Sequence, residues 1–299
     1  MPRPKSKATK PLSPEQLLCM ECIDEEEKNH VAGHRNQFAM LRHMVKEEEG
    51  TVISSMASLI SEKQPLLPLV RDRILKELEH LYQDYDYVTA KDASLTDDLR
   101  REQSGEAGHV HSEDSLVYGE IDLAGFYDLL TTYDALPSTG DFYDLGSGSG
   151  RAVFCARYLR DYRNCVGVEL LPNLHQLAKS VQSLYKFQNY TNKLHPDYRQ
   201  VSFVCSDLLD YDPVWDPPER INAKGSDLSV TIYIPNLLFD QALQDQIAAK
   251  ALKLAPGTHV ISLKQFQQAD FSIQFELKHQ QDVTMSWGDS RVYIYQKKR

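Results

Sequence analysis

The sequence predicts an α/β fold in which a doubly wound, mostly parallel sheet of seven strands follows a helical N-terminal segment. From residue 142 onward, short runs rich in valine, isoleucine and aromatic residues alternate with longer runs of helical periodicity. Before residue 90, apolar residues recur three and four positions apart. Strands that alternate with helices form parallel sheets with helices on both faces, because each crossover is right-handed.

The N-terminal third divides into an arm, a helical segment and a loop. Residues 1–12 carry four basic side chains and little apolar character, so we expect a disordered, solvated arm. Two more specific interpretations are a nuclear import signal and a weak contact with nucleic acid. Residues 13–91 are predicted to be helical, with Ser13 as the first cap and Pro14 in the first turn. Residues 92–116 are polar and lack apolar periodicity, which predicts a loop that either closes over a ligand or stays disordered.

Residues 117–299 are predicted to form the sheet domain, with a helix starting near Asp122. The expected strands are residues 142–146, 164–170, 201–207, 228–234, 258–264, 271–277 and 291–296. Helices are expected at 152–160, at 172–188 and at 238–254, the last ended by Pro256 and Gly257. The last two strands lack an intervening helix, so they are expected to form an antiparallel hairpin at the edge of the sheet.

Composition limits the partners of the chain. Its 299 residues are 41% apolar, and no run approaches the roughly 18 apolar residues of a membrane helix, so no membrane contact is expected. The five scattered cysteines favour a reducing compartment. Cys19 and Cys22 form one C-x-x-C without a second pair, so no metal site is predicted. A net charge of −10 repels nucleic acid and attracts basic proteins.

The first strand runs into a glycine-rich loop, DLGSGSGR, with the pattern D-x-G-x-G-x-G. Glycine permits positive φ and lets a ligand lie against the backbone. Arg151 stands where a dinucleotide-binding loop has its third glycine, which disfavours a pyrophosphate. A carboxylate ahead of the glycines can pair with a cationic group. The loop residues predicted to hold the ligand are Asp144, Gly146, Ser147, Gly148, Gly150 and Arg151.

Two further acids end the next two strands. Glu169 stands where an acid accepts hydrogen bonds from a ribose diol. Asp207 is placed to accept one from the exocyclic amine of adenine. An adenosine with a cationic amino-acid tail and no phosphate describes S-adenosylmethionine. The sequence therefore predicts a class I methyltransferase fold that uses this cofactor.

Several short motifs resemble the Dot1-like, non-SET histone-lysine methyltransferases, named for disruption of telomeric silencing. The motifs are VYGEI at 117–121, VGVE, SDL, SLKQF and MSWG, and the resemblance runs from about Val117 to Tyr295. It implies that Tyr118, Gly119, Glu120 and Ile121 cover the methionine end of the cofactor and that Leu208 joins Asp207 beside the adenine. It also implies a nuclear enzyme that methylates a lysine in the globular core of histone H3 within nucleosomes. Arg151 and Leu208 replace the usual glutamine and phenylalanine.

The segment IPNLLF departs from the family pattern. The family has two asparagines here, and the first, implicated in shaping the methyl-transfer site, is replaced by Pro235. The resemblance leaves Asn236 and Phe239 as catalytic candidates, with Trp287 and either Tyr293 or Tyr295 as walls of the lysine channel. A second interpretation is a methyltransferase for another protein or a small molecule. A third is a chromatin-binding module without turnover.

Overall fold

The computed structural model describes residues 11–29, 35–47, 51–104, 117–133, 135–137, 139–192, 200–216 and 229–299. Most of the expected basic arm and residues 105–116 of the expected loop therefore lie outside the described residues. The chain divides into two compact units, Met1–Asp72 and Arg73–Arg299. The division falls within helix α4 (Leu67–Leu81).

The first unit is helical, as expected. Helix α1 (Pro14–Asn29) packs against α2 (Arg35–Glu47) and α3 (Thr51–Ser61). The N–H of Gln16 donates to Ser13 Oγ at 3.2 Å, and the N–H of Ser13 donates to Gln16 Oε1 at 2.8 Å. This reciprocal pair is a capping box, which confirms Ser13 as the cap of α1.

The described residues contain no group of three or more cysteine, histidine or acidic side chains arranged to hold a metal ion. Cys19 is buried in α1 and Cys22 is half-buried one turn later, and burial raises the pKa of both thiols. Within the same described ranges, no helix combines the length and the apolar character that crossing a membrane requires.

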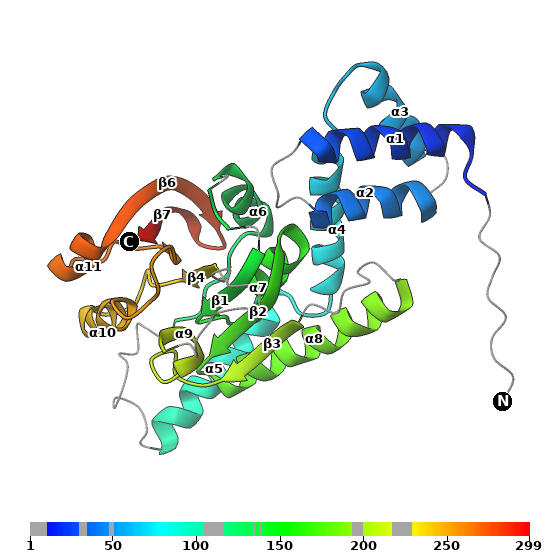
Figure 1. The fold of residues 1–299 in the computed structure, drawn as a ribbon. Helices are drawn as coiled ribbons and strands as arrows, with labels where there is room; N and C mark the ends of the chain where they lie inside the picture. The colour runs from blue at the N-terminus through cyan, green and yellow to red at the C-terminus, as the bar shows by residue number, and fades with distance from the viewer. Residues whose placement is uncertain are drawn as a thin grey trace, which may run out of the picture. The chain divides into compact units, whose positions relative to one another are not determined.

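The second unit contains one seven-stranded sheet in the order β3-β2-β1-β4-β5-β7-β6 (Figure 1). Its strands are β1 (Thr139–Leu145), β2 (Asp161–Glu169), β3 (Gln200–Cys205), β4 (Val230–Ile234), β5 (His259–Ser262), β6 (Phe275–Met285) and β7 (Gly288–Lys297). Strands β1 to β5 pair in parallel, while β7 pairs antiparallel with both β5 and β6. The predicted fold class and the edge hairpin are confirmed.

Helices cover both faces of this sheet. Helices α6 (Leu123–Thr132), α7 (Arg151–Leu159) and α8 (Pro172–Asn192) lie on one face, and α10 (Gln241–Ala251) lies on the other (Figure 1). The chain adds β2 and β3 on one side of β1 and then returns to add β4 and β5 on the other side. Right-handed crossovers therefore place the helices of the two halves on opposite faces. This reversal opens a crevice beyond the carboxyl ends of β1 and β4.

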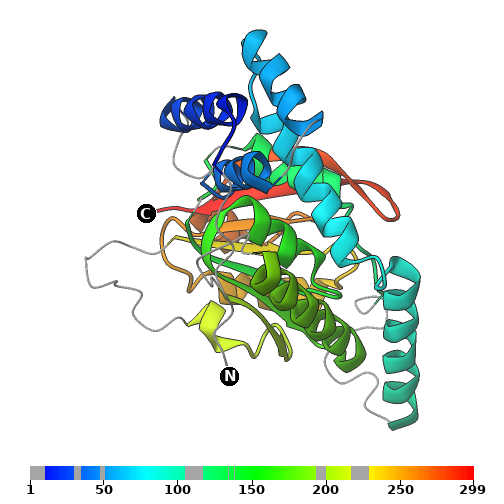
Figure 2. The ribbon, with the colours of Figure 1, turned by 90° about the vertical axis from the view of Figure 1, so that its right-hand side faces the viewer.

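The prediction of a loop over 92–116 is wrong for its first part, because α5 runs from Tyr87 to Ser104 and lies beside α8 (Figure 2). Asp86 caps the helix by accepting the N–H of Thr89 at 2.9 Å and its hydroxyl at 2.8 Å. The buried stripe consists of Ala90, Ser94 and Asp97, which are small or polar. Such a stripe carries almost no hydrophobic periodicity.

A second difference concerns the expected strand at 271–277. Residues Ala269–Gln274 form the short helix α11, and β6 begins only at Phe275. The Phe271 ring stacks on that of Phe275 at 4.2 Å between centroids, which buries both aromatic residues without a continuous strand. An apolar run of this length does not distinguish a helical turn from a strand.

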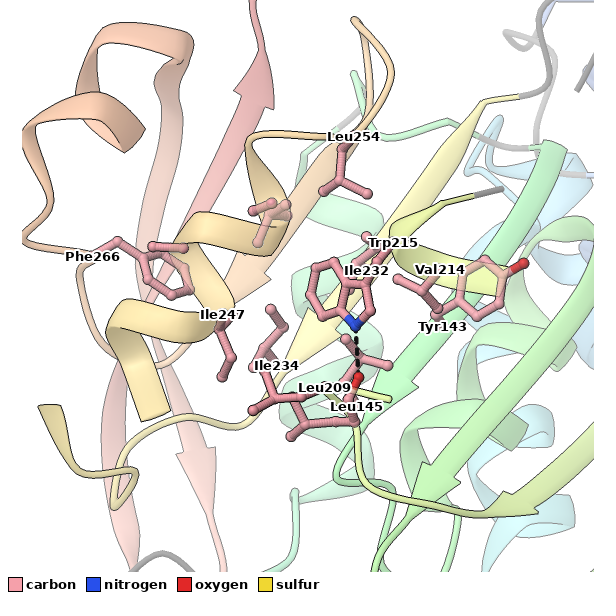
Figure 3. Packing of buried hydrophobic residues seen from close by; sticks show 14 of the residues in the cluster. Tyr143, Leu145, Leu209, Val214, Trp215, Ile232, Ile234, Ile247, Leu254 and Phe266 are labelled. Carbon is pink, nitrogen blue, oxygen red and sulfur yellow. Dashed lines mark hydrogen bonds between the residues drawn. The ribbon is translucent and has the colours of Figure 1, made fainter. Parts of the chain in front are cut away.

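A hydrophobic cluster fills the space between the sheet, the short helix α9 (Asp212–Trp215) and α10 (Figure 3). Alternate residues of β1 and β4 point into it, as expected for strands with a period of two. The buried indole of Trp215 donates from Nε1 to the carbonyl oxygen of Leu208 at 2.6 Å. The core therefore fixes the loop that follows β3.

The burial of His259, at the start of β5, predicts that the stability of the protein depends on pH. Its side chain is buried, and burial together with Lys278 lowers its pKa from 6.5 to about 4. Between these two values the unfolded chain binds a proton that the folded chain does not. The free energy of unfolding should therefore fall as the pH drops from 6.5 toward 4, by up to about 1.4 kcal/mol per pH unit.

Urea unfolding at pH 7.5, 6 and 5 checks this expectation. His259→Gln cannot titrate, so the difference between wild type and variant should shift in favour of the variant as the pH falls. Parallel stability curves for the two proteins would contradict it.

Candidate active site

The glycine loop after β1 folds back onto β2. The N–H groups of Gly146 and Ser147 donate to the carbonyl oxygen of Val168 at 2.9 and 3.0 Å. Gly146 and Gly148 have φ of 105° and 51°, and a Cβ at Gly148 would lie 2.6 Å from the Tyr118 ring. Glycine is therefore required at Gly148 by both its backbone angle and the close approach of Tyr118.

Gly150 ends the loop and caps helix α7. It has φ of 90°, and a Cβ here would lie 2.5 Å from the Phe203 ring. A larger residue would push α7 away from β3. This glycine therefore shapes the packing of helix against sheet rather than the cavity wall.

Asp144 is a buried acid next to the glycine loop, and one of its carboxylate oxygens has no partner among the described residues. Its side chain is 2% exposed, and Oδ1 has no hydrogen-bond partner among the described residues. Burial, and then the charge of Glu169, raise the pKa of Asp144 well above its ordinary value. A buried, unpaired acid on a cavity wall is suited to bind a cation.

Glu169 supports the loop from the end of β2. Its Oε2 accepts the N–H of Gly148 at 2.7 Å, and its Oε1 accepts the N–H of Leu171 at 2.8 Å. Burial raises the pKa of Glu169, while these two donors act against the rise. A carboxylate has about four acceptor positions, so these two bonds do not use all of them. The role of Glu169 toward a ribose stays a prediction.

The loop after β3 is held by its own contacts. Oδ1 of Asp207 accepts the N–H of Leu209 at 2.8 Å, so Asp207 stabilises the turn. Ser206 and Leu208 line the cavity, whereas Asp207 does not. The roles of Leu208 and Asp207 beside adenine stay predictions.

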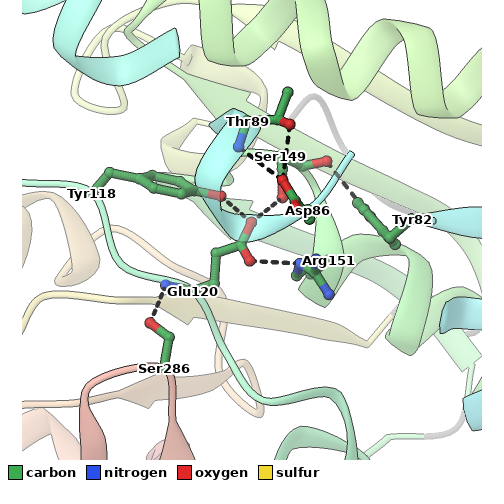
Figure 4. Close-up of polar contacts among 8 residues, drawn as sticks. All are labelled: Tyr82, Asp86, Thr89, Tyr118, Glu120, Ser149, Arg151 and Ser286. Atoms are coloured by element: carbon green, nitrogen blue, oxygen red, sulfur yellow. Dashed lines mark hydrogen bonds and ion pairs between the residues drawn. The ribbon is translucent and has the colours of Figure 1, made fainter. Parts of the chain in front are cut away.

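The carboxylate of Glu120 links the 117–121 segment to the glycine loop (Figure 4). The Tyr118 hydroxyl and Ser149 Oγ both donate to Oε1 of Glu120, the latter at 2.9 Å. Arg151 Nε lies 2.8 Å from Oε2 of Glu120 in an ion pair whose side chains are 16% and 6% exposed. Arg151 thus binds a protein carboxylate here rather than facing a ligand phosphate.

Tyr82, which directly follows α4, also takes part in this network (Figure 4). The guanidinium of Arg151 lies 4.4 Å from the centre of the Tyr82 ring, and the Tyr82 hydroxyl donates to the carbonyl oxygen of Ser149 at 3.0 Å. The ring of Tyr87 stacks on Tyr118 at 6.2 Å between centroids. Three aromatic side chains therefore lie beside the polar contacts.

The same segment also pairs with the hairpin of β6 and β7. The N–H of Glu120 donates to Ser286 Oγ at 3.1 Å, and the N–H of Ser286 donates to the carbonyl oxygen of Glu120 at 2.9 Å. Ile121 forms an antiparallel bridge with Met285. A Cβ at Gly119 would lie 2.2 Å from the ring of Trp287, so only glycine fits beneath this indole.

These elements enclose one cavity of about 560 Å³. The side chains that line it come from α5, the 117–121 segment, the glycine loop and the loops after β2, β3 and β4. They include Tyr87, Lys91, Ser94, Leu95, Val117, Tyr118, Gly119, Glu120, Ile121, Asp144, Gly146, Ser147, Gly148, Ser149, Arg151, Glu169, Leu170, Leu171, Leu174, Leu208, Tyr233, Pro235, Leu237, Leu238, Phe239, Leu243 and Trp287. Nearly all of the predicted cofactor-binding residues therefore meet in one place.

The predicted catalytic residues divide into two groups. Phe239 and Trp287 line the cavity together with Pro235. Asn236 is fully buried outside it, because its Oδ1 accepts the N–H groups of Leu263 and Lys264 at 2.9 and 3.0 Å. Its Nδ2 donates to the carbonyl oxygen of Lys264 at 3.2 Å. Asn236 therefore joins β4 to β5 and has no free amide atom for a substrate.

Tyr293 also lies away from the cavity lining. It pairs with Ser262 of β5 and stacks on Tyr295 at 6.4 Å between centroids. Tyr295 packs in the hydrophobic cluster against Phe266 and Phe271. The described structure does not bring either tyrosine to the site.

Some cavity residues were missed by the sequence argument. Tyr87, Lys91 and Ser94 lie on α5, a helix whose pattern is too polar to be recognised. Tyr233 lies inside a strand whose apolar run suggested only core packing. The segment after β2 contributes Leu170, Leu171 and Leu174.

Most residues of this site lie within a region that is similar to known proteins. Residues 106–292 match the family model described as histone methylation protein DOT1. The histone-lysine N-methyltransferase, H3 lysine-79 specific, of Candida albicans is 29% identical over 193 residues, which are 60% of this chain and 13% of that protein. The protein of the same name from Eremothecium gossypii is 27% identical over 163 residues, 54% of this chain and 26% of that protein. The chain thus spans only a minor part of the length of these relatives.

Part of the chain is also similar to solved structures. TrmN from Thermus thermophilus has 18% sequence identity and a TM-score of 0.40, over 62% of this chain and 51% of that one. The methyltransferase yhhF from Escherichia coli has 14% identity and a TM-score of 0.40, over 58% of this chain and 84% of that one. The family match covers more than half of the chain and includes the glycine loop, the 117–121 segment and Trp287. This chain belongs to the DOT1 histone methylation family.

Proposed function

We propose that the cavity binds S-adenosylmethionine and that the protein is a methyltransferase. The observation that carries this proposal is the orphaned Oδ1 of Asp144, buried at the base of the glycine loop. A cationic ammonium group would supply its missing partner, whereas a phosphate would be repelled. The positive φ of Gly146 and Gly148 leaves the backbone open to a ligand, and the two hydrogen bonds to Glu169 do not use all of its acceptor positions. These residues fit the cofactor.

For the acceptor, we propose a lysine of histone H3 in nucleosomes. The family membership supports this choice, as does the similarity to the two H3 lysine-79 specific methyltransferases of Candida albicans and Eremothecium gossypii. The net charge of −10 favours a basic histone surface. A nuclear location follows from this substrate. The basic residues before Ser13 are proposed to add weak contact with nucleosomal DNA.

The cofactor supplies an activated methyl group, and the protein supplies alignment and a dry site. A lysine amine is protonated at neutral pH and must lose a proton before it can attack. Pro235, Leu237, Leu238, Phe239 and Trp287 give the far half of the cavity apolar walls. Burial among them disfavours the charged ammonium and thereby lowers the pKa of the incoming lysine, so no strong base is needed.

Methyl transfer from labelled S-adenosylmethionine to reconstituted nucleosomes and to free histone H3 tests this function. Gly146→Arg should bring the label to background, because a side chain at this position starts 3.3 Å from Pro235 and fills the cavity. Gly257→Arg is the matched control. Both glycines have positive φ, 105° and 87°, but a Cβ at Gly257 meets nothing within 4 Å. The control carries the backbone strain and should retain activity.

Label on one lysine of H3, located by mass spectrometry, would support the proposal. Label that appears only on other proteins or small molecules of a lysate would mean a different acceptor. Nucleosome binding without any transfer, unaffected by Gly146→Arg, would indicate a chromatin-binding module instead.

A further inference from the structure

Tyr233 carries a second orphaned polar group on the cavity wall. Its side chain is 1% exposed, and its hydroxyl has no hydrogen-bond partner among the described residues. The ring packs against Phe126 at 5.0 Å between centroids, and Tyr233 is among the residues that line the cavity. A buried hydroxyl without a partner destabilises a protein. It therefore calls for a partner that the described residues do not provide.

The strand order places this hydroxyl at the centre of the site. Apart from the 117–121 segment, the predicted cofactor contacts follow β1, β2 and β3, on one side of the crevice. The apolar walls of the proposed acceptor channel follow β4 and the hairpin of β6 and β7, on the other side. Tyr233 on β4 is in register with Asp144 on β1, and paired residues of parallel strands point to the same face. Tyr233 thus stands where the two halves meet.

The other polar side-chain groups near the channel already have partners. Trp287 Nε1 donates to Ser290 Oγ at 2.9 Å. The amide of Asn236 is bonded to residues after β5, and Pro235 has neither a side-chain amide nor an N–H. The remaining described walls from β4 onward are leucine and phenylalanine. Within the described cavity lining of this half, the Tyr233 hydroxyl is the uncommitted polar side-chain group.

We propose that Tyr233 is a catalytic residue that orients the acceptor amine, its hydroxyl oxygen accepting an N–H of the incoming neutral amine. The inference rests on the proposed methyltransferase function. Burial, and then the charge of Asp144, raise the pKa of Tyr233 well above its ordinary value, so the hydroxyl stays neutral. A neutral oxygen can accept from an amine without drawing off the proton.

The chemistry balances without any further reactant. The lone pair of the amine nitrogen forms the new N–C bond, and the electron pair of the broken C–S bond stays on sulfur. The nitrogen gains a positive charge and keeps both protons, one of them directed at the Tyr233 oxygen. This hydrogen bond strengthens as the charge develops, so it favours the transition state over the bound amine. The methylated ammonium later releases a proton to solvent.

Tyr233→Phe, made in the full chain, removes this oxygen alone. The turnover number for nucleosomal H3 should fall roughly tenfold to a hundredfold, with little change in KM. The dissociation constant of S-adenosylhomocysteine, measured by calorimetry, should not change. The unfolding midpoint should stay the same or rise, because an unsatisfied buried hydroxyl has been removed.

Tyr162→Phe is the matched control. The Tyr162 hydroxyl is also buried, but it donates to Thr231 Oγ1 at 3.3 Å and lies outside the cavity lining. Its loss should lower the unfolding midpoint and leave turnover unchanged. Tyr233→Phe should therefore lower turnover without a loss of stability, whereas Tyr162→Phe should lower stability without a loss of turnover.

Three results would overturn the assignment. Unchanged turnover in Tyr233→Phe would show that the hydroxyl has no role in transfer. Weaker S-adenosylhomocysteine binding with normal turnover at saturating cofactor would place the hydroxyl in the cofactor half. A wild-type protein that binds S-adenosylhomocysteine but labels no acceptor would remove the proposed function, and the role of Tyr233 would fall with it.

Discussion

Asp144→Asn should weaken S-adenosylhomocysteine binding by thirtyfold or more while making the ligand-free protein more stable. The carboxylate is proposed to pair with the ammonium group of the ligand, and loss of one partner of a buried charge pair costs about 2–5 kcal/mol. Without ligand, Oδ1 is buried and unpartnered, so its charge opposes folding. A neutral amide should raise the free energy of unfolding at pH 7 by about 1 kcal/mol or more.

The pH dependence has a definite sign. The folded chain holds the Asp144 proton at higher pH than the unfolded chain does, because burial raises its pKa. Stability from this group is therefore present at low pH and is lost as the pH rises from the ordinary value of 3.8 through the raised one. The advantage of Asp144→Asn should shrink on acidification. Ligand binding should release a proton and grow stronger with increasing pH.

Asp141→Asn is the matched control on the same strand. Asp141 is equally buried, but its carboxylate is bonded to Arg163 at 2.8 and 3.0 Å and to Asn164 at 2.8 Å. This variant should lose stability and keep ligand affinity. Calorimetry and urea unfolding measure both quantities. If both variants lose stability and Asp144→Asn binds ligand normally, Asp144 is a structural acid.

Glu120→Ala should destabilise the protein by about 3–5 kcal/mol, the usual cost of removing one partner of a buried ion pair. It leaves the buried guanidinium of Arg151 unpaired and frees the Tyr118 and Ser149 hydroxyls. The 117–121 segment should loosen, so ligand affinity should fall as well. Urea unfolding and ligand calorimetry at pH 7 measure these two losses.

Two comparisons make this prediction specific. The double variant Glu120→Ala, Arg151→Ala should be less destabilised than the sum of its single variants, because no charge is then left unpaired. Glu276→Ala removes an exposed acid 2.6 Å from Lys278 on β6 and should change neither stability nor affinity measurably. Strict additivity of the Glu120 and Arg151 effects would show that the ion pair contributes nothing.

Much of this site could be predicted because glycine loops and strand-end acids are local signals. The order D-x-G-x-G-x-G directly after an apolar strand placed Asp144, Gly146 and Gly148 correctly on one cavity wall. Parallel strands end at the same edge of a sheet, so successive acids could be assigned to one site without coordinates.

The remaining features depend on contacts that sequence does not encode locally. Helix α5 buries the polar residues Ser94 and Asp97 in place of an apolar stripe, and Asp97 Oδ2 accepts the N–H of Asn173 at 2.7 Å. Asn236 looked catalytic from its motif, but its amide is used by the backbone after β5. Arg151 looked like part of the ligand loop, and its partner Glu120 lies on the covering segment.

The hydrogen bonds between Glu120 and Ser286 join residues 166 positions apart in the chain. During synthesis, a nascent chain could complete the glycine loop and most of the parallel sheet while Ser286 is still inside the ribosome. The covering segment would then have no hairpin to pair with, and the cavity would lack the wall formed by Trp287. A partly made chain that ends before this hairpin would therefore be unable to form the complete binding site.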